Sequence, residues 1–254
     1  MGWNMYLRGH PHVRDLLELL LSYGLILAVI WTPMPWQRYL YWLAVLCIVL
    51  VTLLQRERLH ALGLAPDHAL YSFWIVAAAI LLAMPAVVIA WRMDTLHSLP
   101  TFGHLSLGTR MSGYVVWSFL QEFVLQVYVL TRLLHLFSRR WIAISTAALL
   151  FAVVHMPNPV LAGLTLLWAL IACPWFLRYR NLYALGLAHG ILGICVAITV
   201  PDAVHHHMRV GLGYLHYHPH QHGIHRSSAP QIVSTPACVM EDAATLRSAL
   251  HARP

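Results

Sequence analysis

The sequence has 254 residues, of which 59% are apolar and only 10% are charged. Soluble domains carry about 25% charged residues, so this composition excludes an ordinary soluble protein and indicates a helical membrane protein with several spans. The net charge of +7 does not indicate nucleic-acid binding, because the arginines lie at the ends of apolar runs, where basic residues determine membrane topology.

Seven apolar runs approach the length of about 20 residues that a helix needs to cross a bilayer. They predict an all-α, polytopic transmembrane helical bundle over residues 1–200, with an eighth, weaker span as the alternative. The fifth run is short, because the two prolines of "HMPNP" prevent the helix from continuing. The predicted spans are 16–33, 36–54, 70–91, 112–136, 141–156, 160–177 and 182–200.

Arginines near the ends of these spans gather on one side of the membrane. That side receives Arg8, Arg14, Arg56, Arg58, Arg139, Arg140, Arg178 and Arg180, whereas the other side receives Arg38, Arg92 and Arg110 near the spans. The side richer in arginine is expected to be cytoplasmic. The sequence therefore predicts a cytoplasmic N-terminus and a C-terminus outside. An eighth span would place the C-terminus on the opposite side of the membrane.

The composition changes after Pro201, where a histidine-rich stretch begins. We predict that residues 201–254 form a largely flexible tail, because they are polar and contain no long apolar run. Histidine-rich tracts bind zinc, nickel or copper, but the scattered spacing here favours weak binding over a dedicated site.

Among the ionisable residues of the predicted spans, three are singled out: Glu122 in the fourth, His155 at the end of the fifth and His189 in the seventh. A charged carboxylate costs on the order of 3 kcal/mol in the bilayer, so such a residue is expected to be functional, with a structural hydrogen bond between helices as the alternative. Glu122, His155 and His189 are predicted to converge and to activate a water molecule. They can do so as general acids and bases or as ligands of a divalent metal such as zinc.

Polar neighbours surround these residues in the sequence. Gln126 lies one helical turn after Glu122 and is expected to donate a hydrogen bond to the carboxylate, whereas Gln121 is rotated away by about 100°. Asn158, between two prolines, is either a donor near His155 or a turn residue. The sequence has no HExxH, no GxSxG and no aspartate within a predicted span, so other common hydrolytic sites are absent.

The order of these motifs resembles the CPBP family of intramembrane proteases, which includes Rce1-type CAAX prenyl proteases and bacteriocin-processing and immunity proteins. The family motifs are EExxxR, FxxxH and HxxxN or HxxxD, and the resemblance covers roughly residues 50–200. "FAVVH" (151–155) matches the second motif in full, Glu122 matches the second glutamate of the first, and His189 matches the histidine of the third. The departures are Gln121, Gln126 and Gly193, which stand where the family has glutamate, arginine and asparagine.

The resemblance implies an intramembrane endopeptidase in a bacterial cytoplasmic (inner) membrane, with a membrane-anchored protein or peptide as substrate and no nucleic acid as partner. It implies that Glu122 and His155 activate water and that His189 stabilises the oxyanion. Gln121 and Gln126 would orient the carboxylate, and Asn158 would replace the lost asparagine. No cofactor is required in this mechanism, although zinc held by Glu122, His155 and His189 remains an alternative.

Two other functions remain open on the sequence alone. The altered first motif is compatible with a non-catalytic family member that acts as a membrane binding or immunity protein. Glutamate and histidine inside the membrane are also typical of a proton- or metal-coupled transporter, although no inverted repeat is evident.

Overall fold

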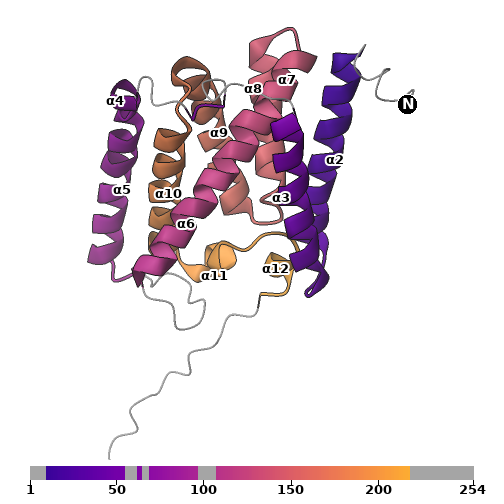
Figure 1. The fold of residues 1–254 in the computed structure, drawn as a ribbon. Coiled ribbons are helices and arrows are strands. Elements are labelled where there is room, and N and C mark those ends of the chain that lie inside the picture. Colours follow the sequence, from indigo (N-terminus) through magenta and orange to yellow (C-terminus); the bar gives the residue numbers. More distant parts are fainter. Residues whose placement is uncertain (1–9, 55–61, 65–68, 97–106, 218–254) are drawn as a thin grey trace, which may run out of the picture. The chain divides into compact units, whose positions relative to one another are not determined.

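The computed structural model describes residues 10–54, 62–64, 69–96 and 107–217. All regular secondary structure in these ranges is helical, which confirms the predicted all-α bundle. Figure 1 shows the helices, which are α2 (Pro11–Trp31), α3 (Trp36–Leu54), α4 (Ala69–Ser72), α5 (Trp74–Arg92), α6 (Leu107–Glu122), the π-helix η1 (Phe123–Leu130), α7 (Thr131–Leu136), α8 (Arg140–Val153), α9 (Pro159–Tyr179), α10 (Leu182–Thr199), α11 (Asp202–His205), the 3-10 turn η2 (His206–Met208) and α12 (Gly211–Leu215).

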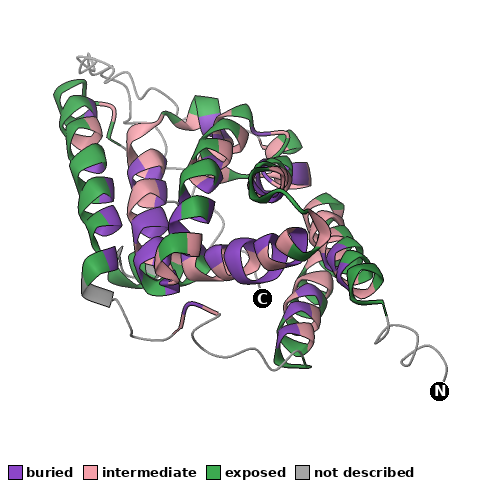
Figure 2. Ribbon diagram, turned by 90° about the horizontal axis from the view of Figure 1, so that it is seen from above, coloured by how far each residue is buried: buried purple, intermediate pink, exposed green. Residues whose placement is uncertain are grey.

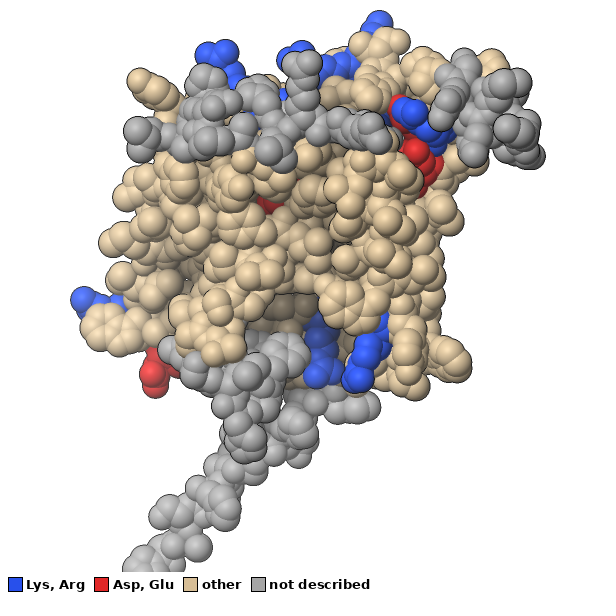
Figure 3. Space-filling view, viewed as in Figure 1, with Lys and Arg blue, Asp and Glu red and all other residues tan. Residues whose placement is uncertain are grey.

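Five helical segments of the described chain are long and apolar enough to cross a membrane: α3, α5, the continuous rod Met111–Leu136, α9 and α10. The other two predicted spans correspond to α2, which has 21 residues but carries Arg14, Asp15 and Glu18, and to α8, which has 14 residues. In the view of Figure 3, arginine side chains gather at two opposite edges, and the surface between them carries almost no charged side chains. The protein is therefore integral to a membrane.

The best buried elements are η1 and α10. Every side chain from Leu125 to Leu130 is buried, and ten of the 18 residues of α10 are buried. Figure 2 shows that the outer helices bury only a narrow stripe and expose the rest. Such an exposed apolar surface is expected of helices that face lipid. Polar groups placed on η1 or α10 are therefore shielded from lipid by the surrounding helices.

Small residues bring α10 close to α6. Cβ atoms added to Gly186 and Gly193 would approach the rings of Phe119 and Tyr114 to 2.6 Å, so both aromatic rings occupy space that a side chain on α10 would fill. Glycine at such positions lets two membrane helices approach closely. This packing places the first part of α6 against the helix that carries His189.

Residues 201–217, here termed the C-terminal strap, fold back onto the bundle. The strap contains α11, η2 and α12, which lie at the lower end of the bundle in Figure 1. The Gly211 amide donates to the Met156 carbonyl (2.9 Å), and Gly211 packs against Ile30 of α2 with a positive φ of 54° that suits glycine. Most of the tail predicted to be flexible, residues 218–254, lies outside the described residues.

Candidate active site

Glu122, the last residue of α6, has no exposed surface. Its Oε1 accepts hydrogen bonds from the Trp168 indole Nε1 (2.5 Å) and the His189 Nδ1 (2.7 Å). Its Oε2 accepts a hydrogen bond from the Gln126 Nε2 (3.1 Å). A buried carboxylate is tolerated when donors satisfy its oxygens, and three donors on three elements do so here.

The π-helix η1 begins directly after Glu122 and contains Gln126. Hydrogen bonds in a π-helix span five residues, and such turns are frequent at functional sites. The predicted hydrogen bond between Gln126 and Glu122, four residues apart, is present. Gln126 thus supplies the polar partner that lies on the same rod as the carboxylate.

His189 lies in the middle of α10 and brings the second ionisable group to Glu122. Its helix begins at Asn181, whose Oδ1 accepts from the Ala184 amide and whose Nδ2 donates to the Ser72 Oγ (2.6 Å). Because a carboxylate oxygen accepts, the His189 Nδ1 carries the proton in this contact. The predicted convergence of Glu122 and His189 is therefore direct, across 67 residues of sequence.

His155 lies in the turn that follows α8, close to the same pair. Its Nδ1 donates to the Phe151 carbonyl (2.7 Å), so its Nε2 is the ring nitrogen left to accept a proton in the neutral form. The Phe151 ring meets both imidazoles edge to face, with centroids 4.9 Å from His155 and 6.1 Å from His189. Phe151 thus contacts both histidines, and Glu122 joins the group through its hydrogen bond with His189.

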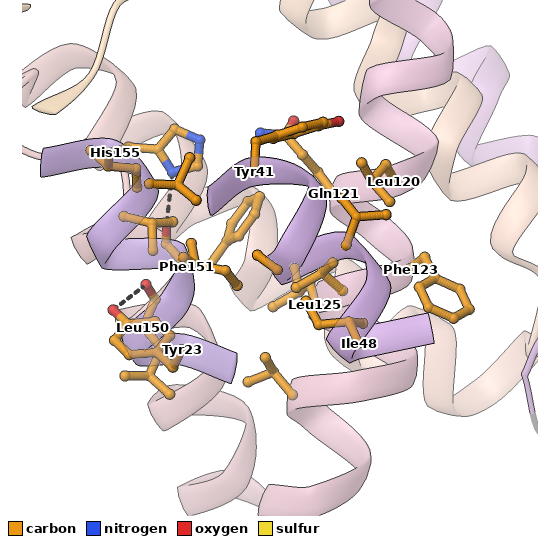
Figure 4. A pocket seen from close by; sticks show the side chains of 18 of the residues that line it. Tyr23, Tyr41, Ile48, Leu120, Gln121, Phe123, Leu125, Leu150, Phe151 and His155 are labelled. Atoms are coloured by element: carbon orange, nitrogen blue, oxygen red, sulfur yellow. Dashed lines mark hydrogen bonds between the residues drawn. The ribbon is translucent and has the colours of Figure 1, made fainter. Parts of the chain in front are cut away.

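An apolar cavity of ≈ 190 Å³ adjoins His155. Its walls come from α2, α3, α6, η1 and α8, and Val210 of the C-terminal strap also contributes. Figure 4 shows five residues that line the cavity: His155, Tyr41 and Gln121 lie in the upper part of the view, with Leu125 and Ile48 below them. Gln121 therefore lines this cavity, on a different side of α6 from the bonds of Glu122.

Asn158 bonds to the backbone around it. Its Oδ1 caps α9 by accepting from the Leu161 amide (3.1 Å), and its Nδ2 donates to the carbonyls of His205 (2.8 Å) and Arg209 (3.1 Å). These bonds match the turn-residue interpretation and also attach the C-terminal strap to the start of α9. An asparagine followed by proline at the first helical position is a recognised start signal, which makes this cap readable from the sequence.

The fit of a metal ion can be judged from the donor atoms. Among residues 10–54, 62–64, 69–96 and 107–217, no group of three His, Cys, Asp or Glu side chains is placed to hold a metal ion. Glu122 Oε1 and His189 Nδ1 bond to each other, and the Nδ1 of His155 bonds to a carbonyl. In the described ranges the side chains are therefore not already placed as the three-ligand zinc alternative requires.

The sequence interpretation missed Trp168. This residue lies in α9, donates to Glu122, and packs its ring against His189 with centroids 5.5 Å apart. The sequence contains ten tryptophans, and no local pattern distinguishes this one. Only the packing of α9 against α8 and η1 reveals its contact with the carboxylate.

Comparison with protein families gives one match. The model of the type II CAAX prenyl endopeptidase Rce1-like family matches residues 103–195. No curated protein and no solved structure matches the chain. The matched segment contains Glu122, His155 and His189, which confirms the resemblance drawn from their motifs. Over the residues that build this site, the chain is similar to the Rce1-like type II CAAX prenyl endopeptidases, a family of membrane proteases.

Proposed function

We propose that this protein is an intramembrane endopeptidase that hydrolyses a peptide bond with water activated by Glu122, His155 and His189. The observation that carries the proposal is the fully buried Glu122 carboxylate bonded to His189, with His155 and His189 both in contact with the Phe151 ring. Burying these groups is costly, and a merely structural contact between helices does not require three of them. The family match to residues 103–195 supports the same reaction class.

The tautomers of the two histidines suggest which residue takes part in each proton transfer. His155 has its Nδ1 proton engaged by Phe151, so its Nε2 accepts a proton from water while the water oxygen bonds to the substrate carbonyl carbon. Glu122 stabilises an imidazolium at His189, whose Nε2–H then donates to the oxyanion. The proton held by His155 passes to the leaving nitrogen as the carbon–nitrogen bond breaks. Gln126 keeps Glu122 in place throughout.

The substrate we propose is a membrane-anchored protein or peptide with an apolar group near the scissile bond. The cavity beside His155 is lined almost entirely by apolar side chains, and Gln121 lies near its polar end. The family name refers to CAAX prenyl substrates, and a prenyl group has the apolar character that such a cavity accepts. A prenylated peptide ending in a CAAX sequence is therefore the first probe to use.

We further propose a bacterial cytoplasmic membrane with the N-terminus inside and the C-terminus outside. The support is the excess of arginine near one set of span ends. An alkaline phosphatase fused after Pro254 should be active under this topology, and inactivity of that fusion would reverse the assignment of the C-terminus.

The deciding experiment compares wild type with Glu122→Gln and His155→Ala. Membrane proteomics of C-termini in the host would identify processed proteins, and liposomes with the prenylated CAAX peptide would give rates. Loss of a general acid or base should lower the rate about 10²- to 10⁴-fold, because glutamine keeps the shape of Glu122 without its proton chemistry.

His135→Ala is the matched control, because this histidine contacts Asp15 and lies outside the proposed site. It should cleave at the wild-type rate. If all variants process the same proteins at the same rate and expression level, the protease function is wrong and a binding or transport role takes its place.

A further inference from the structure

The two carboxylate oxygens of Glu122 accept different numbers of hydrogen bonds. Oε1 receives both the Trp168 indole and His189, whereas Oε2 receives only Gln126. A carboxylate oxygen has two lone pairs, so two donors saturate Oε1 and Oε2 retains one free acceptor position among these partners. Any further donor to the carboxylate would therefore have to bond to Oε2.

Trp168 contacts both Glu122 and His189. Its indole N–H occupies one lone pair of Oε1, and its ring packs against the His189 imidazole at an interplanar angle of 47°. The side chain therefore fixes the carboxylate and its histidine partner at the same time. An indole donates only, has few rotatable bonds and does not titrate, so this contact persists whatever the protonation state of the pair.

No permanently charged donor contacts Glu122 among the hydrogen bonds of the described residues. The donors are an amide, an indole and an imidazole, of which only the imidazole titrates. Because an arginine at this place would stay charged throughout a reaction cycle, it would hold the carboxylate ionised. His189 is therefore the one of these three donors that can itself carry a charge.

We propose that Trp168 is a positioning residue that saturates Oε1 of Glu122 and thereby holds the carboxylate and His189 in the orientation that hydrolysis requires. This role rests on the proposed function, since it requires that Glu122 takes part in hydrolysis. Trp168 does not touch the reacting atoms, and it acts through Glu122 and His189.

Trp168→Phe tests the role, and Trp175→Phe is its matched control. Trp175 lies two turns further along α9 and is buried, but its indole Nε1 has no hydrogen-bond partner among the described residues. Both variants remove the same atoms from the same helix, and only Trp168→Phe removes a bond to the carboxylate. Trp168→His, which keeps a ring N–H, serves as the conservative variant.

We expect Trp168→Phe to lower kcat about tenfold or more on the prenylated CAAX peptide in liposomes, with KM within about twofold of wild type. Trp175→Phe should leave both constants unchanged, and Trp168→His should recover part of kcat. Equal kcat values in the two phenylalanine variants, in a wild type that cleaves, would overturn the positioning role alone. If wild type cleaves neither the peptide nor any protein found by the proteomic comparison, the proposed function fails and the positioning role fails with it.

A spectroscopic measurement decides the same question if Trp168→Phe does not fold. With ¹⁵N-labelled indoles in detergent, the Trp168 N–H proton should resonate furthest downfield, because it donates to a charged acceptor. Glu122→Gln should move this signal upfield and leave the Trp175 signal in place. An unmoved Trp168 signal would show that the bond to Glu122 does not exist, and the inference would be wrong.

Discussion

Gly193 illustrates how one missing side chain adjusts the contact between two helices. It stands one turn after His189, where the related motif carries asparagine, and the Tyr114 ring of α6 occupies the space that such a side chain would need. Restoring asparagine at this position would therefore collide with Tyr114. The loss of that residue and the packing of α6 on α10 are linked.

Gly193→Ala should destabilise the protein by about 1–3 kcal/mol, because the added methyl group overpacks a close helix contact. Thermal unfolding in detergent would measure the change. Gly113→Ala in α6 is the control, since nothing lies within 4 Å of a Cβ at Gly113 and alanine favours a helix. Combining Gly193→Ala with Tyr114→Ala should cost less than the sum of the single changes, and simple additivity would show that the two side chains do not compete for space.

At the scale of elements, Asn158 joins the start of α9 to the C-terminal strap. One oxygen caps the helix and one nitrogen donates to two strap carbonyls, so one side-chain amide joins the strap to the start of α9. Val210 of the strap also lines the apolar cavity. The strap is therefore part of the wall that a substrate group would meet.

Asn158→Ser separates the two roles of this residue. A serine hydroxyl can still cap α9, whereas both donors to the strap are lost, at about 1 kcal/mol for each bond. Hydrogen exchange at the Gly211 amide should accelerate by about 10- to 30-fold, and the Leu161 amide should keep its protection.

Asn181→Ser is the matched control, because Asn181 caps α10 in the same way and donates its amide to Ser72 instead. This change should leave the exchange of Gly211 untouched. If Asn158→Ser accelerates neither Gly211 nor its neighbours, the amide does not hold the strap.

At the scale of the whole molecule, a polar network ties the first helix to the rod that carries the site. Arg132 is buried in α7 and donates to the Glu18 carboxylate (2.9 Å) and to the Tyr128 carbonyl. The Tyr128 hydroxyl bonds with Ser22 of α2 (2.6 Å) and donates to the Glu18 carbonyl. This network fixes α2 against η1 and α7, on one side of the cavity.

Glu18→Gln should cost about 3 kcal/mol, because it leaves the guanidinium of Arg132 buried without its charge partner. The double change with Arg132→Met should restore much of this loss, since it removes the unpaired charge as well. Thermal unfolding of the single and double variants gives the coupling free energy. A double variant as unstable as the sum of its parts would mean that the two side chains do not act as a pair.

The sequence predicted the bounds of the helices well, but it did not predict which helices contact one another. Apolar runs predicted 36–54 and 182–200, and the helices span Trp36–Leu54 and Leu182–Thr199, because burial in lipid requires a run of that length. The contact of Glu122 with Gln126 was predictable because both lie on one rod. The pairing of Glu18 with Arg132 was not, because 114 residues separate them and no local pattern encodes which helices become neighbours.

The distribution of the site over α6, α9 and α10 has a consequence for how the protein is made. A chain is synthesised from its N-terminus, so α6 reaches the membrane before α9 and α10 can pack against Glu122. During that interval Gln126, on the same helical rod, is the donor within reach of Glu122. The rest of the free-energy cost of placing the carboxylate in the membrane is not yet offset by Trp168 and His189. The proposed site is therefore complete only when α10 has been inserted, so we expect a chain truncated before Leu182 to show none of the proposed hydrolysis.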